Sequence, residues 1–125
     1  MMQKPNGSGI GRVFKAAKCS MQGFAATWRH EAAFRQEATL AVLSVPLAVW
    51  LAQSFQQFAL LIGVWCLVLI VELLNSAIET LTDRVSLERH ELSGRAKDMG
   101  SAAVFLSLIL VALVWGSALY SRFFS

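Results

Sequence analysis

The sequence predicts an all-α membrane protein with three transmembrane helices, preceded by an amphipathic helix at the membrane surface. Two observations lead to this fold class. Hydrophobic residues make up 56% of the 125 residues and charged residues only 15%, an unusually apolar balance for so small a soluble domain. In addition, no charged residue or histidine occurs from Ala38 to Val71 or from Met99 to Ser121. We expect residues 1–125 to form a single membrane domain.

The part of the chain before the first apolar run is expected to lie outside the bilayer. Residues 1–11 are rich in glycine and polar residues and offer no apolar face, so we expect a disordered tail there. Residues 12–31 form an amphipathic helix, because apolar side chains recur at spacings of three and four, with Lys15, Lys18 and Arg29 to one side. Such a helix suits an anionic membrane surface, and packing against the transmembrane helices would produce the same pattern. Nucleic-acid binding fits this membrane chain poorly.

The three spans are expected at residues 32–52, 56–85 and 94–121. A spanning helix needs about 20 apolar residues, so the first uncharged run is too long for one span and slightly short for two. The polar segment Gln53–Gln57 marks the turn between them, and the second helix continues beyond the lipid as a cytoplasmic extension. Pro46 removes one backbone hydrogen bond from the first span and is expected to kink it.

The distribution of basic residues predicts the orientation. Every Lys and Arg except Arg122 lies either before the first uncharged run, which begins at Ala38, or between the two uncharged runs. The positive-inside rule places these segments in the cytoplasm. The N-terminus is therefore expected inside the cell and the C-terminus outside.

Four polar residues of the second span share one helical face: Glu72, Asn75, Glu79 and Asp83. Glu72 follows an unbroken apolar run at the lipid boundary, where an ionised carboxylate is costly. Glu79 lies about 10 Å closer to the cytoplasm. The deep carboxylate suits proton transfer from a lipid hydroxyl, and the shallow one suits a hydrated cation such as Mg²⁺. The alternative, strongest for Asp83, is a solvated acidic face on a helix that leaves the membrane.

Candidate residues on the other helices lie at the level of Glu79. Glu31, where the surface helix meets the first span, could complete a metal site or pair with Arg35 four residues later. Lys97 and Asp98 open the third span and suit phosphate oxygens, although a lysine at the cytoplasmic end of a span is common. The sequence has no P-loop and no kinase-type Gly-rich loop, so any phosphoryl transfer must be built on helices.

Three segments resemble the signature sequences of the prokaryotic integral-membrane diacylglycerol kinases, of the Gram-negative type: residues 31–37 (EAAFRQE), 71–79 (VELLNSAIE) and 90–103 (HELSGRAKDMGSAA). The resemblance implies a homotrimer of three-span protomers in the bacterial inner membrane, with a periplasmic C-terminus and each active site shared between neighbours. It also implies a lipid-metabolic activity, the Mg²⁺-dependent transfer of the ATP γ-phosphate to diacylglycerol, which yields phosphatidic acid.

The same resemblance implies a role for individual residues. Glu72 corresponds to the catalytic base, Asn75 to a residue that supports it, and Glu31 and Glu79 to Mg²⁺ ligands that also contact ATP. The other ATP-binding positions are Arg12, Glu88, Arg89, His90, Lys97 and Asp98. The lipid-substrate positions are Ala33, Phe34, Arg35, Gln36, Glu37, Glu72 and Ser101. Cys19 departs from the pattern, because the family typically has an aromatic residue at this nucleotide-side position.

Three other functions fit part of the pattern. The nearest is a related kinase that acts on undecaprenol, a long polyprenyl alcohol, but residues 33–37 look like the diacylglycerol-specific form. A small transporter would place a carboxylate near the middle of the bilayer, and the expected spans have none there. A purely structural membrane subunit would not need Glu72, Asn75 and Glu79 on one face.

Overall fold

The computed structural model describes residues 9–85 and 91–124, and its secondary structure is entirely helical. The helices are α1 (Ile10–His30), α2 (Ala32–Leu51), α3 (Phe55–Val85) and α4 (Glu91–Phe124). This confirms the predicted all-α class. Helix α1 begins at Ile10, directly after Gly9 with its positive φ of 62°, and not at Arg12 as predicted for the surface helix. Helix α4 begins at Glu91, three residues before the expected start of the third span.

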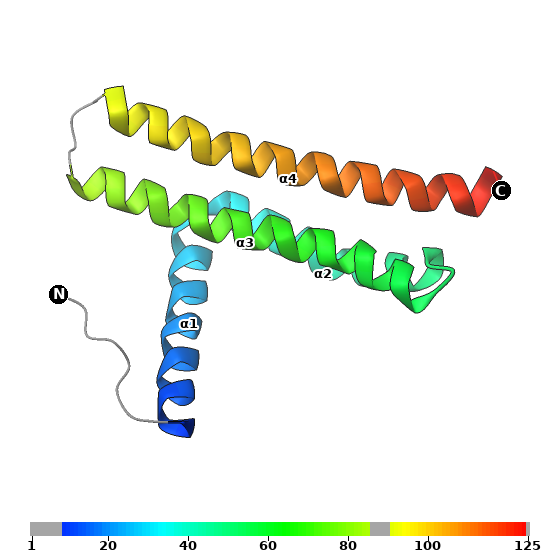
Figure 1. Cartoon of the computed structure of the whole chain (residues 1–125), viewed down its shortest axis with the longest axis horizontal. Helices are drawn as coiled ribbons and strands as arrows, with labels where there is room; N and C mark the ends of the chain where they lie inside the picture. The colour runs from blue at the N-terminus through cyan, green and yellow to red at the C-terminus, as the bar shows by residue number, and fades with distance from the viewer. Residues whose placement is uncertain (1–8, 86–90, 125) are drawn as a thin grey trace.

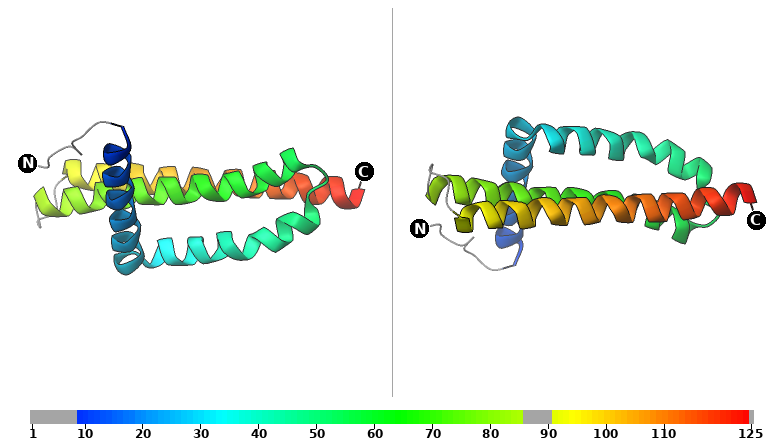
Figure 2. Two further views of the ribbon diagram at one scale, coloured as in Figure 1. Left: turned by 90° about the horizontal axis from the view of Figure 1, so that it is seen from below. Right: turned by 90° about the horizontal axis from the view of Figure 1, so that it is seen from above.

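Helix α3 is the central element of the fold. It runs alongside α4 for most of its length and packs against α2 as well, whereas α2 and α4 touch little (Figure 1). Helix α1 crosses this layer at a steep angle, near the end at which α2 begins, and meets α2 at a sharp corner (Figures 1 and 2). Because α3 makes most of the contacts with α2 and α4, its face decides which side chains come together.

Two of the described helices, α3 and α4, are long and apolar enough to cross a membrane. They contain 31 and 34 residues, and most of their apolar side chains are exposed, as on Leu74 and Leu113. A core helix of a soluble protein would bury such side chains. The exposed apolar surface therefore indicates a membrane protein, in agreement with the composition.

Side-chain hydrogen bonds in the turn between α2 and α3 explain where α3 begins. The Ser54 hydroxyl accepts a hydrogen bond from the Gln57 backbone N–H (3.0 Å), and the Gln57 side chain accepts one from the Gln53 N–H (2.7 Å). This is close to the reciprocal capping arrangement that begins many helices, so α3 starts at Phe55 within the predicted turn segment. Pro46 lies inside α2, which bows visibly in Figure 2.

The corner between α1 and α2 consists of one extended residue, Glu31 (φ −121°, ψ 108°). Its backbone N–H donates to the Thr27 carbonyl (2.8 Å). The Arg35 guanidinium reaches back from α2 and donates to the carbonyls of Trp28 (2.6 Å) and Arg29 (3.3 Å). A cation at the carbonyl end of a helix is favourable. Arg35 thus caps the C-terminal carbonyl groups of α1 and fixes the corner that places Glu31 beside α3.

The apolar stripe of α1 is left largely uncovered by its own chain. None of the α1 side chains is buried, and Phe14 and Trp28 remain exposed. Contacts with α2 and α3 are few. Packing against the other helices of one chain therefore does not account for the stripe.

Candidate functional site

The deep carboxylate lies where α3 faces the first turns of α2. Glu72 is 4% exposed, and its carboxyl group shares a hydrogen bond with the carboxyl group of Glu37. The Oε2 atom of Glu37 is buried and has no hydrogen-bond donor as a partner among the described residues. The two carboxyl groups thus meet at the buried end of this polar face.

The next polar residue on this face, Asn75, contacts both Glu79 and α4. Its side-chain amide donates a hydrogen bond to the Glu79 carboxylate. Its Oδ1 atom is buried without a partner in the described part of the chain and lies directly against Gly100. A Cβ atom at position 100 would collide with that oxygen. The absence of a side chain at Gly100 thus allows α4 to approach Asn75, a contact that sequence analysis did not predict.

We expect Gly100→Ala to lower the free energy of unfolding by about 1–3 kcal/mol, because the added methyl group overpacks the α3–α4 interface against Asn75. The measurement is unfolding of the purified protein in micelles titrated with a denaturing detergent. Gly116→Ala is the matched control, since it lies in the same helix and its Cβ would meet no atom within 4 Å. That variant should be unchanged or up to about 1 kcal/mol more stable. Equal effects of the two substitutions would contradict the steric explanation.

A cluster of charged side chains surrounds the shallow carboxylate. Glu31 and Asp83 place negative charge near Glu79, and Lys97 of α4 places positive charge there. The Lys97 Nζ atom lies 2.6 Å from Asp83 Oδ1, and both side chains are substantially exposed. An exposed ion pair contributes only about 0–1 kcal/mol. Lys97 can therefore leave Asp83 for an incoming phosphate at little cost.

The carboxylates of Glu31 and Glu79 lie near enough to interact electrostatically. Arg35 donates to the end of α1, and the described ion pairs include none between Glu31 and Arg35. Among the described residues, no group of three or more His, Cys, Asp or Glu side chains is placed to hold a metal. Magnesium commonly uses one or two carboxylates and completes its shell with phosphate oxygens and water. Two carboxylates, one at the α1–α2 corner and one on α3, fit that requirement.

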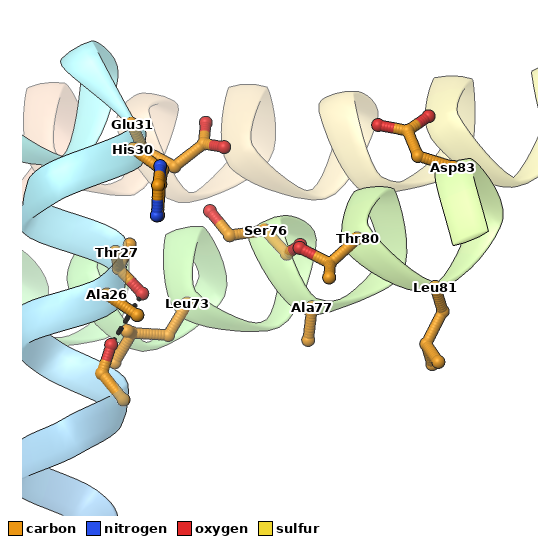
Figure 3. Close-up of a pocket in the computed structure, with 11 residues that line it drawn as sticks. Ala26, Thr27, His30, Glu31, Leu73, Ser76, Ala77, Thr80, Leu81 and Asp83 are labelled. Carbon is orange, nitrogen blue, oxygen red and sulfur yellow. Dashed lines mark hydrogen bonds between the residues drawn. The ribbon is translucent and has the colours of Figure 1, made fainter. Parts of the chain in front are cut away.

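A groove of about 700 Å³ opens between α1 and α3 beside this cluster. Figure 3 shows Glu31 and His30 at one side, Asp83 at the far end, and Ser76 and Thr80 between them. The wall from α1 is small or polar, as at Gly23. The groove thus joins the α1–α2 corner to the charged end of α3.

The remaining candidates lie at several places. Phe34 is buried in the first turn of α2, and a second hollow of about 480 Å³ lies along the same helix, lined by Arg35, Gln36, Thr39 and Leu40. Ala33, near the start of α2, and Asp98, near the start of α4, are both exposed. Ser101 is exposed next to Gly100. Glu88, Arg89 and His90 lie outside the described residues.

Arg12 does not join the charged cluster of its own chain. It is exposed near the start of α1, 19 residues before Glu31. At 1.5 Å per residue this corresponds to about 28 Å along the helix. Cys19, on the same helix, is exposed and has a free thiol. The structure thus brings together Glu31, Glu79 and Lys97 but leaves Arg12 far from them.

Comparisons of the sequence with known proteins point to one family. The sequence pattern of the family described as prokaryotic diacylglycerol kinase matches residues 18–119. A diacylglycerol kinase of Escherichia coli is 50% identical over 118 residues, covering 94% of this chain and 97% of the relative. Relatives of the same description from Pseudomonas aeruginosa (52% over 112 residues, 90% and 91% covered) and Helicobacter pylori (41% over 119 residues, 95% and 93% covered) also match. The chain belongs to the prokaryotic diacylglycerol kinase family.

Proposed function

We propose that this protein transfers the γ-phosphate of ATP to diacylglycerol and so forms phosphatidic acid at the cytoplasmic face of the bacterial inner membrane. The observation that carries the proposal is the order of groups along α3. A buried carboxyl pair, Glu72 and Glu37, lies next to the long apolar stretch of α3, and Glu79 with Lys97 lies nearer the charged end of that helix. Family membership supports the same activity.

The two ends of this arrangement serve the two substrates. The diacylglycerol hydroxyl enters beside Glu72, which takes its proton while the hydroxyl oxygen attacks the γ-phosphorus. The bond between that phosphorus and the β,γ-bridging oxygen breaks, and ADP leaves. Phe34 and the hollow along Arg35 and Gln36 lie on the α2 side of Glu72, which suits the glycerol backbone of the lipid. Burial of Glu72 keeps water from competing with the lipid hydroxyl.

The phosphates are expected at the shallow end of the groove. Glu31 and Glu79 would hold Mg²⁺, which when bound neutralises phosphate charge. Asn75 holds the Glu79 carboxylate in place by its amide hydrogen bond. Lys97 exchanges its exposed partner Asp83 for a phosphate oxygen, where its positive charge stabilises the charge that develops during transfer.

The same proposal places three spans in the membrane and three chains in the enzyme. Helix α2 has 20 residues, which corresponds to about 30 Å and matches the hydrocarbon thickness, so it serves as the span before α3 and α4. The basic residues favour a cytoplasmic N-terminus and a periplasmic C-terminus. A nucleotide contact by Arg12 requires a neighbouring chain, since Arg12 is far from Glu31 of its own chain. This requirement supports an oligomer with shared sites, which we propose to be a homotrimer.

We expect the purified protein in mixed micelles to phosphorylate diacylglycerol in the presence of ATP and Mg²⁺, and to lose this activity when Mg²⁺ is chelated. The measurement is the formation of radiolabelled phosphatidic acid. Undecaprenol in the same micelles is the control acceptor and should be phosphorylated much more slowly. Activity confined to undecaprenol would assign the protein to the polyprenol kinases. No transfer to either lipid would contradict a kinase function.

A further inference from the structure

Ser76 lies on α3 between the two carboxylates of the proposed reaction. It follows Glu72 by four residues and precedes Glu79 by three. Along the helix axis these separations are about 6 Å and about 4.5 Å, and the three side chains project from the same side of the helix. In the proposed reaction the lipid hydroxyl lies at the level of Glu72 and the metal-bound phosphates at the level of Glu79. Ser76 is therefore at the level that the transferred phosphate must occupy.

The hydroxyl group of Ser76 is buried and has no partner. Ser76 is 6% exposed, and its Oγ atom makes no hydrogen bond in the described part of the chain. The buried serines Ser44 and Ser107 behave differently, because each donates to a carbonyl of its own helix at 2.7 Å. A buried hydroxyl without a partner is unfavourable and rare in native proteins. A ligand that supplies an acceptor would remove that cost.

The Ser76 side chain lines the groove between α1 and α3. Figure 3 shows its hydroxyl directed toward the side of the groove where Glu31 lies. The neighbouring hydroxyls of the groove are already used, since Thr27 donates to the Gly23 carbonyl (2.9 Å) and Thr80 donates to the Ser76 carbonyl (2.8 Å). Among the described groove residues, Ser76 thus offers a free hydroxyl donor at the phosphate level.

We propose that the Ser76 hydroxyl donates a hydrogen bond to a non-bridging oxygen of the ATP γ-phosphate and is a catalytic residue of this enzyme. The inference rests on the proposed kinase function. Ser76 forms no covalent bond: the lipid oxygen bonds to phosphorus, the bridging oxygen leaves with ADP, and the proton goes to Glu72. The non-bridging oxygens carry the charge of the transition state, so a fixed donor between base and metal stabilises that state.

The kinetic test is Ser76→Ala, which removes the donor and little volume. We expect kcat for diacylglycerol phosphorylation to fall by about 10²-fold, with the KM for ATP changed by no more than about fivefold. Ser76→Thr keeps the hydroxyl and should recover much of the rate. Ser107→Ala is the matched control, since it is also a buried helical serine, and its rate should stay within about twofold of wild type. A kcat of Ser76→Ala within about threefold of wild type would overturn the proposal.

A binding measurement separates this inference from the proposed function. The full-length protein in micelles with Mg²⁺ is titrated with ADP and with an ATP analogue that has a methylene group between the β- and γ-phosphorus. Ser76→Ala should weaken binding of the analogue by about three- to fivefold and leave ADP unaffected. Equal effects on both nucleotides, or none, would overturn the Ser76 contact. Ser76→Ala could weaken binding of the analogue and not of ADP while the wild-type protein fails to phosphorylate diacylglycerol. That result would overturn only the proposed lipid acceptor.

Discussion

Glu72→Gln is expected to lower kcat for diacylglycerol phosphorylation by about 10²–10⁴-fold, the range in which general-base catalysis contributes. Glutamine has the size of glutamate and can still form a hydrogen bond with the neighbouring Glu37 carboxyl group, but it cannot accept the proton of the lipid hydroxyl. Nucleotide affinity should be unchanged, because Glu79 lies about 10 Å further along α3 and Lys97 lies near Glu79. The loss should therefore appear in kcat and not in the KM for ATP.

The experiment combines steady-state kinetics with titration of the methylene-bridged ATP analogue. Glu91→Gln is the control, because Glu91 is an exposed carboxylate of α4 that forms an ion pair with Arg95 at 3.7 Å. Its activity should remain close to that of wild type. Two results would contradict the role of Glu72 as base: turnover near the wild-type rate in Glu72→Gln, or loss of nucleotide binding by that variant. Unfolding measured in the same micelles checks that the variant is folded.

The order of the groups along α3 could be predicted from the sequence because it depends on one helix alone. The spacing of Glu72, Asn75 and Glu79 determines both the shared face and the axial separation once the segment is helical. The helices themselves could be predicted because their apolar runs and polar breaks, such as Gln53–Gln57, follow local rules. These features need no knowledge of the tertiary structure.

The contacts between helices could not be predicted in the same way. The carboxyl pair of Glu37 and Glu72, and the contact of Asn75 with Gly100, depend on which faces of separate helices meet and on their relative depth. Arg35 is a further example, since four-residue spacing suggested Glu31 as a partner, whereas the guanidinium donates to the carbonyls of Trp28 and Arg29.

Ser76 was missed for a different reason. Serine in a helix commonly donates to a carbonyl of the preceding turn, as Ser44 and Ser107 do, so its presence in the segment 71–79 carries no signal by itself. Its position four residues after Glu72 was the available clue. Only the structure shows that its hydroxyl is buried and without a partner among the described residues.

Lys97→Met is expected to lower kcat/KM for ATP by about 10²–10³-fold, because it removes the cation that faces the phosphates while keeping most of the apolar length of the side chain. Asp83 then loses its partner, but it is exposed, and the loss of an exposed ion pair changes stability by only about 0–1 kcal/mol. The effect on the free energy of unfolding should therefore be small compared with the effect on catalysis. The KM for diacylglycerol should be unchanged, since Lys97 lies at the shallow end of the site.

Arg95→Met provides the matched control for this prediction. Arg95 is a basic residue of the same helix, and its ion pair with Glu91 is also exposed. If Lys97 acts only through the general positive charge at the start of α4, the two variants should lose similar activity. If Lys97 acts at the phosphates, Arg95→Met should stay within about threefold of wild type and Asp83→Asn should do the same, because neither removes the Lys97 ammonium group. Large losses in all three variants would instead indicate that the Lys97–Asp83 ion pair maintains the structure of the site.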